Sequence, residues 1–103
     1  MKYTDPLDSK ALEREARESR EREQLELENV LNDLRWVMSE KRGRRIIARW
    51  LEFTGVDRSS FHTSGSVMAF NEGQRNVGLK LISQLLQASP ELYATILEEF
   101  GKK

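Results

Sequence analysis

The 103-residue sequence contains no cysteine, only two prolines and a single histidine. Without cysteine there is no disulfide framework, no thiol nucleophile and no zinc–thiolate site. No segment approaches the roughly 18 to 20 consecutive apolar residues that a membrane-spanning helix needs. The first ten residues also lack the apolar core of a secretion signal. We therefore expect no membrane segment and no secretion signal, and an intracellular origin is compatible with this composition.

An excess of charge of one sign is also missing, because 17 basic and 17 acidic side chains balance. Their distribution along the chain is nevertheless uneven. Residues 1–34 carry a net charge of −4, residues 35–58 carry +4, and residues 59–103 carry four charges of each sign. Such asymmetry indicates partners or internal pairing more than it indicates a fold.

Charged residues dominate the first part of the chain. Twelve of the 19 residues from 10 to 28 are charged, and only three are large apolar leucines. These residue types favour a helix, but they offer little apolar surface for a core. The sequence predicts a charged helical extension or arm over residues 1–28, capped by Asp8 or Ser9, with Pro6 just outside the helix. Two interpretations stay open: a solvated surface helix, or an arm that orders on a partner.

Apolar residues at helical spacing begin after this arm, and no segment shows the alternation of a strand. The first helix is predicted to end near Ser39, which then caps a second helix that stops at Gly55. The remaining signals are a loop over 56–65, a third helix from Ser64 or Ser66, and a fourth from Ser89 and Pro90 to about Phe100. The fold class is therefore all-α: a small bundle of about four helices over residues 29–103, with a long charged N-terminal helical extension.

The apolar positions of these helices predict the core. The expected buried side chains are Ile46, Ile47, Trp50, Leu51 and Thr54 of the second helix, Val56 and Phe61 of the loop, Phe70, Val77, Leu81, Ile82 and Leu85 of the third helix, and Leu92, Ile96 and Phe100 of the fourth. A domain of about 75 residues buries only a small core and is marginally stable. Oligomerisation or docking on a partner would stabilise it, so we expect one of these.

Patterns that carry catalysis or ligand binding are lacking. The single histidine, His62, has no acid at metal-ligand spacing, and nothing in the spacing of Asp57, Ser59 and His62 supports a catalytic triad. There is no phosphate-binding loop, dinucleotide fingerprint or EF-hand pattern. We expect no enzyme activity, and no catalytic, cofactor-binding or metal-binding residues.

Cations crowd the start of the second predicted helix. They are Lys41, Arg42, Arg44, Arg45 and, one turn later, Arg49. The helix macrodipole disfavours positive charge at this end unless something negative lies close by. Three interpretations follow: internal pairing with the acidic extension or with Glu98 and Glu99, contact with a protein partner, or contact with nucleic acid. Nucleic acid is the least favoured of the three, because the chain has no basic excess.

Two glycines interrupt the third predicted helix. Gly in a helix interior costs about 0.8–1.0 kcal/mol relative to Ala, so Gly73 and Gly78 need a reason. Close approach of another helix at Gly78 is the structural interpretation, and Gly73 marks either the start of the helix or a kink. The functional interpretation is a partner surface centred on Arg75 and Asn76. Arg75 can also pair with Glu72 one turn earlier.

These segments together resemble the Bbp19-like family of small tailed-phage proteins, from about residue 29 to residue 100. The resemblance rests on several motifs, which are Asp33-Leu34-Arg35, Gly43-Arg44-Arg45, Trp50-Leu51, Gly55-Val56, Ser59-Ser60-Phe61, Phe70-x-Glu72-Gly73-x-Arg75-Asn76-Val77-Gly78, Pro90, Tyr93 and Glu99. It implies an accessory protein of the phage particle, with no enzymatic role and no catalytic residues to carry over. By the same resemblance, Gly43, Gly55, Gly73 and Gly78 are packing or turn positions, and Arg45 and Arg75 are salt-bridge or partner contacts.

The resemblance predicts a virion-associated structural or assembly protein that binds other particle proteins of the head, portal, tail or interior. Its expected partners are phage structural proteins and other copies of itself, and its expected location is the virion, with the host cytoplasm during assembly. The alternative is a nucleic-acid-associated or ejected phage protein that uses the basic helix start at 41–49. A regulator that binds a host protein is a third possibility.

Overall fold

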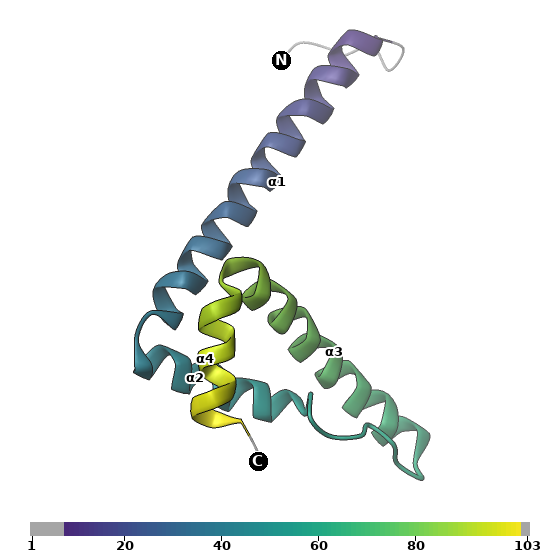
Figure 1. Ribbon diagram of the computed structural model, residues 1–103. Coiled ribbons are helices and arrows are strands. Elements are labelled where there is room, and N and C mark those ends of the chain that lie inside the picture. Colours follow the sequence, from purple (N-terminus) through teal and green to yellow (C-terminus); the bar gives the residue numbers. More distant parts are fainter. Residues whose placement is uncertain (1–7, 102–103) are drawn as a thin grey trace. The chain divides into compact units, whose positions relative to one another are not determined.

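The computed structural model describes residues 8–101, so the expectation for Pro6 lies outside the described residues. Four helices make up this part of the chain (Figure 1): α1 (Ser9–Met38), α2 (Lys41–Thr54), α3 (Gly65–Ala88) and α4 (Pro90–Phe100). Residues 8–101 contain no strand. The prediction of an all-α fold with about four helices is confirmed.

The contacts divide the chain into two units, one that ends at Val30 and one that begins at Leu31. Within the described part of the first unit, α1 is a solvated helix. The Asp8 carboxylate caps its start by accepting hydrogen bonds from the backbone N–H groups of Lys10 (3.1 Å) and Ala11 (3.2 Å). All side chains of residues 20–30 are exposed. This part of the chain, here called the arm, is therefore held by helix propensity and its cap rather than by a core.

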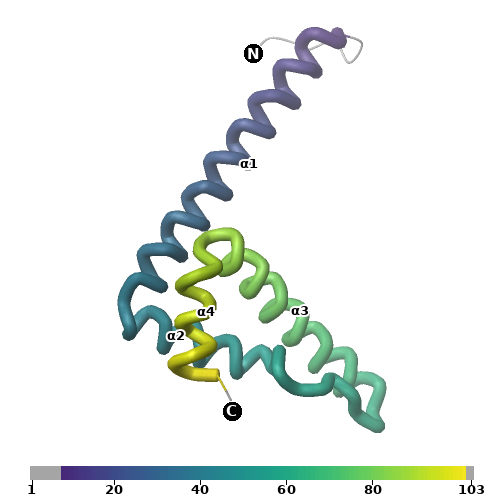
Figure 2. Tube along the Cα trace, in the orientation of Figure 1, coloured from purple at the N-terminus to yellow at the C-terminus, as the bar shows by residue number. Residues whose placement is uncertain are grey.

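The second unit packs three helices and the last turns of α1 around one small core. Helices α2, α3 and α4 each contact the other two, and Figure 2 follows the chain through them. Met38 and Leu85 are fully buried at the centre. The other buried members of the core are Ile47, Leu51, Ala88 and Ile96. Because six residues make up this buried cluster, the domain depends on its caps and close helix contacts as well as on burial.

A left-handed backbone conformation explains Gly55, and a close helix contact explains Gly78. The backbone of Gly55 adopts φ +73°, the left-handed conformation that ends α2 as predicted. A Cβ atom at Gly78 would overlap side-chain atoms of Thr54 and Val56, which lie at the end of α2 and in the loop after it. The predicted close approach at Gly78 is therefore confirmed. Gly73 is not the start of the helix, because it lies inside α3, and no atom lies within 4 Å of its ideal Cβ position.

The predicted cap of α2 is wrong by one residue. The N-cap position is Glu40, and its side chain makes no capping hydrogen bond. Ser39 instead serves the preceding helix, because its hydroxyl donates to the Trp36 carbonyl oxygen at 2.6 Å. Its side chain is thus occupied by a carbonyl group at the end of α1 that has no partner within the helix.

Five predicted core residues are exposed. The relative exposures are 50% for Ile46, 57% for Trp50, 75% for Phe61, 65% for Phe70 and 64% for Val77. Those in helices lie at the edges of apolar stripes whose centres are buried, such as Ile47 and Leu51 in α2. Among residues 31–101 no further element covers those edges, so the side chains remain in solvent.

Ser89 joins two helices, and replacing its side chain should weaken the start of α4. Its backbone N–H caps α3 by donating to the Leu85 carbonyl, while its hydroxyl accepts from the Leu92 N–H at the start of α4. We expect Ser89→Ala to cost about 1 kcal/mol of unfolding free energy, because one N-terminal N–H of α4 loses its acceptor. Ser89→Asp keeps an acceptor and should cost less. Urea titration of both variants measures the two losses of unfolding free energy. Equal losses in the two variants would contradict the capping role.

Candidate protein-binding surface on helix α2

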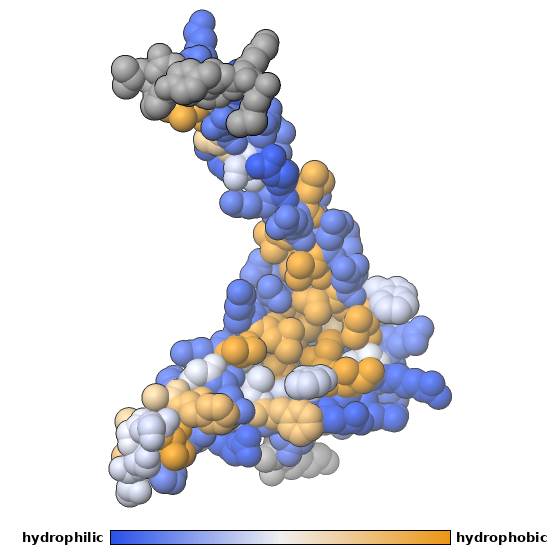
Figure 3. All heavy atoms as spheres, turned by 180° about the vertical axis from the view of Figure 1, so that it is seen from behind, coloured by the Kyte–Doolittle hydropathy of each residue, from blue (hydrophilic) through white to orange (hydrophobic). Residues whose placement is uncertain are grey.

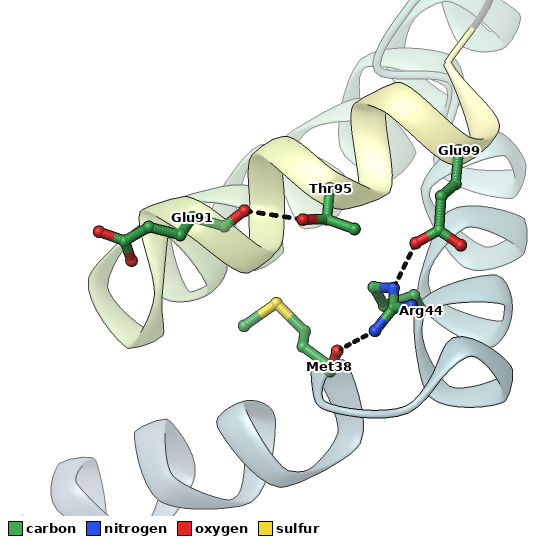
Figure 4. A network of polar contacts seen from close by, with 5 residues as sticks. All are labelled: Met38, Arg44, Glu91, Thr95 and Glu99. Atoms are coloured by element: carbon green, nitrogen blue, oxygen red, sulfur yellow. Dashed lines mark hydrogen bonds and ion pairs between the residues drawn. The ribbon is translucent and has the colours of Figure 1, made fainter.

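Arg44 is the one cation of the predicted cluster that is paired inside the described chain. Its Nε donates to Glu99 Oε1 at 2.5 Å, and its Nη1 donates to the Met38 carbonyl oxygen at 2.8 Å (Figure 4). Each charge lies at the unfavourable end of its own helix dipole, Arg44 near the N-terminus of α2 and Glu99 near the C-terminus of α4. Their ion pair compensates both. The side chain joins the ends of α1, α2 and α4, and it therefore serves the fold.

Arg35 has a similar capping role, which the sequence interpretation missed. Its Nε donates to the carbonyl oxygen of Ala88, the last residue of α3, at 2.5 Å, and its Nη1 donates to Asn32 Oδ1 at 2.6 Å. A helix end leaves its last four carbonyl groups without partners in the helix. The signal in the sequence was the Asp33-Leu34-Arg35 motif, but only the fold shows which carbonyl the arginine reaches.

The remaining cations of the cluster are exposed to solvent. Lys41, Arg42, Arg45 and Arg49 form no ion pair with any residue in the range 8–101. Among residues 8–101, internal pairing, one of the three interpretations, therefore accounts for Arg44 alone. Positive charge at this end of a helix is unfavourable until an anion approaches. The geometry favours a negatively charged partner for the other four.

An apolar stripe runs beside these cations on α2. Ile46, Trp50 and Phe53 follow one another at steps of four and three, so they share one side of the helix. All three are at least half exposed. The rings of Trp50 and Phe53 meet edge to face, with centroids 5.3 Å apart. Phe53 was missed in the sequence interpretation, although its spacing from Trp50 could have identified it.

A groove of about 280 Å³ lies between α2 and α4. Its lining residues are Arg45, Ala48, Arg49, Leu51, Glu52, Asp57, Ile96, Leu97, Phe100 and Gly101. Arg45 and Arg49 thus line this groove together with apolar side chains. Leu97 is 52% exposed there. Burial raises the pKa of the nearby Tyr93 above its ordinary value of 10.0, and the Asp57 carboxylate adds to the shift.

Exposed apolar side chains outnumber buried ones in this unit. Twelve large hydrophobic residues between Trp36 and Leu97 are exposed, against six in the buried core. Figure 3 shows hydrophobic surface gathered over the helical domain on one side of the molecule. Contiguous exposed apolar surface rimmed by charge is typical of a protein–protein interaction site.

The Bbp19-like phage protein family model matches residues 34–98. The chain belongs to this family. Comparison with curated proteins and with solved structures gave no match. The matched residues lie entirely within the second unit and contain α2, α3 and most of α4. The protein is thus phage-associated, and the α2 surface belongs to its Bbp19-like region.

The other predicted contact residues do not join the α2 surface into one site. Arg75 lines a second, polar groove of about 340 Å³, formed by Thr54, Gly55, Arg58, Ser59, Ser60, Asn71, Gln74 and Arg75. It also pairs with Glu72 at 3.8 Å, as the sequence suggested. Asn76 is exposed and lines neither groove. Arg75 therefore lines a different groove from Arg45 and Arg49.

The described residues contain neither a candidate metal cluster nor a membrane-spanning helix. Residues 8–101 contain no group of three or more His, Asp or Glu side chains placed to bind a metal. His62 is exposed in the loop, where its Nδ1 accepts a hydrogen bond from the Ser64 N–H at 2.9 Å. No helix among them is long and apolar enough to cross a bilayer.

Proposed function

We propose that this Bbp19-like protein is a non-enzymatic component of a tailed-phage particle or of its assembly. It binds other particle proteins, and it resides in the virion and, during assembly, in the host cytoplasm. The observation that carries the proposal is the surface of α2, where exposed Ile46, Trp50 and Phe53 lie beside arginines that have no ion-pair partner among residues 8–101. Aromatic residues and arginine are the types most enriched at the centres of protein interfaces.

The composition of this surface favours protein over nucleic acid as the partner. Phosphate binding rests on a basic excess, whereas this chain has a net charge of zero and an acidic first third. Large apolar side chains at helical spacing match the recognition of an amphipathic segment. A partner surface that is acidic and partly apolar would pair with the arginines and cover the apolar stripe of α2.

The proposal is tested in the phage that encodes the protein. Mass spectrometry of purified particles, split into head and tail fractions, should find the wild-type chain in one fraction. Trp50→Ser with Phe53→Ser removes two exposed rings and should reduce incorporation at least about tenfold while helix content by circular dichroism stays unchanged. Leu86→Ser, a change at a residue of α3 that is 44% exposed, is the matched control and should be incorporated normally.

Three results would contradict the proposal. The chain could be missing from complete particles, or its deletion could leave particles complete and infectious. The third is salt-dependent retention on DNA that is lost when Arg42, Arg45 and Arg49 are replaced, with particle binding unaffected. That result would support the nucleic-acid alternative instead.

A further inference from the structure

Charged and apolar side chains alternate along the exposed side of α2. Arg42, Ile46 and Arg49 follow one another at steps of four and three, so they form one stripe along the helix. Ile46 is 50% exposed, and neither arginine has an ion-pair partner among residues 8–101. We call these three residues the basic stripe.

The arm carries the complementary pattern at the same spacing. Glu21, Leu25 and Glu28 also follow one another at steps of four and three. Leu25 is 60% exposed, and both glutamates are exposed. Glu28 Oε1 accepts a long hydrogen bond from the neighbouring Gln24 Nε2, at 3.5 Å. We call Glu21, Leu25 and Glu28 the acidic stripe.

The two stripes match in length as well as in charge. Seven residues of α-helix span about 10.5 Å, so the two glutamates and the two arginines have the same separation. An apolar side chain lies between the charges in both stripes. Two helices placed side by side with these stripes facing would form two ion pairs around one Leu–Ile contact, with Trp50 and Phe53 extending the apolar surface.

We propose that the acidic stripe of one copy of this protein docks on the basic stripe of a second copy. This inference rests on the proposed function, because it uses the same α2 surface and names its partner. Residues 9–38 contain no glycine or proline at which α1 could break, which favours pairing between copies over pairing within one chain. Because each copy carries both stripes, two copies can make the same contact twice in a closed dimer.

Charge reversal tests the pairing through sedimentation velocity at low salt. The wild-type chain should sediment as an oligomer that dissociates as salt rises, because the exposed ion pairs are screened. Glu21→Lys with Glu28→Lys, or Arg42→Glu with Arg49→Glu, should each raise the dissociation constant at least about tenfold, because like charges then face each other. Circular dichroism of each variant checks that the helices are intact.

Recombining the variants gives the decisive result. A mixture of the two doubly reversed chains should form a heterodimer, since the arm of each now matches α2 of the other. A single chain with all four reversals should self-associate again. The matched control, Glu23→Lys with Glu26→Lys, makes the same charge change on the opposite side of the arm helix and should leave association within about twofold of wild type.

The inference is overturned if the wild-type chain is a monomer at low salt. It is also overturned if the reversed chains still associate, or if their mixture does not. None of these results would contradict the proposed function if Trp50→Ser with Phe53→Ser still reduces incorporation into particles. In that case the α2 surface binds a different particle protein. Conversely, the stripes could mediate association in a protein that is missing from particles. That result would contradict the proposed function and support the dimer.

Discussion

Gly43→Ala is expected to destabilise the helical domain by about 3 kcal/mol or more, because the added methyl group meets backbone rather than a movable side chain. A Cβ atom at Gly43 would overlap the carbonyl oxygen of Val37 and lie 2.7 Å from the carbonyl carbon. Relief requires the first turn of α2 to move away from the last turn of α1. That movement would also separate Arg44 from the Met38 carbonyl, to which it is now 2.8 Å distant.

The same substitution at Gly73 provides the control. Nothing lies within 4 Å of an added Cβ there, and the residue is exposed inside α3. Gly73→Ala should therefore stabilise the domain by about 0.8–1.0 kcal/mol, the difference in helix propensity. Urea unfolding followed by circular dichroism measures both variants. An unchanged midpoint for Gly43→Ala, or a loss for Gly73→Ala, would contradict this account of the close contact.

Glycine at these positions illustrates what the sequence predicts and what it does not. The left-handed turn at Gly55 and the close approach at Gly78 follow from glycine's lack of a Cβ, and both were expected. The contact at Gly43 depends on which backbone atoms α1 places opposite it. That information lies in the packing of two helix ends, and the spacing of residues does not contain it.

Helix periodicity has a similar limit for the core. It correctly places Ile47, Leu51 and Leu85 on the buried sides of their helices. It also placed Trp50 and Phe70 there, although both are more than half exposed. Periodicity identifies the apolar side of a helix, but it does not say whether another element covers the edge of that side. In a domain of this size the edges stay open, and they form the candidate binding surface.

The arginines at the start of α2 likewise differ in burial and pairing, although their sequence context is the same. Arg44 and Arg45 are adjacent in the sequence and have the same chemistry. The former has a side chain that is 14% exposed and lies in an ion pair, while the latter lines the groove between α2 and α4. Which arginine is structural depends on the position of Glu99 in space, 55 residues away along the chain. The sequence offered Glu99 as an internal partner alongside Glu98 and the acidic extension, and the fold selects it.

Arg44→Met is the second substitution with a large expected effect, a loss of about 2–3 kcal/mol of unfolding free energy. Methionine retains much of the aliphatic volume but removes the donors to Glu99 and to the Met38 carbonyl. Glu99, whose side chain is 21% exposed, would keep a charge with little access to water. A carbonyl group at the end of α1 would lose its partner as well.

A double-mutant cycle with Glu99→Gln separates the two contacts of Arg44. Glu99→Gln alone should cost less, about 1 kcal/mol, because the amide oxygen can still accept from Arg44 Nε while the charge is lost. The double variant should be more stable than the sum of the single losses predicts, since no unpaired charge remains. For a domain of 60–100 residues each kcal/mol moves the melting temperature by about 4–8 °C, so thermal unfolding resolves these differences. Strictly additive losses would mean that Arg44 acts through the Met38 carbonyl alone, and that the ion pair contributes nothing to holding α4 against α2.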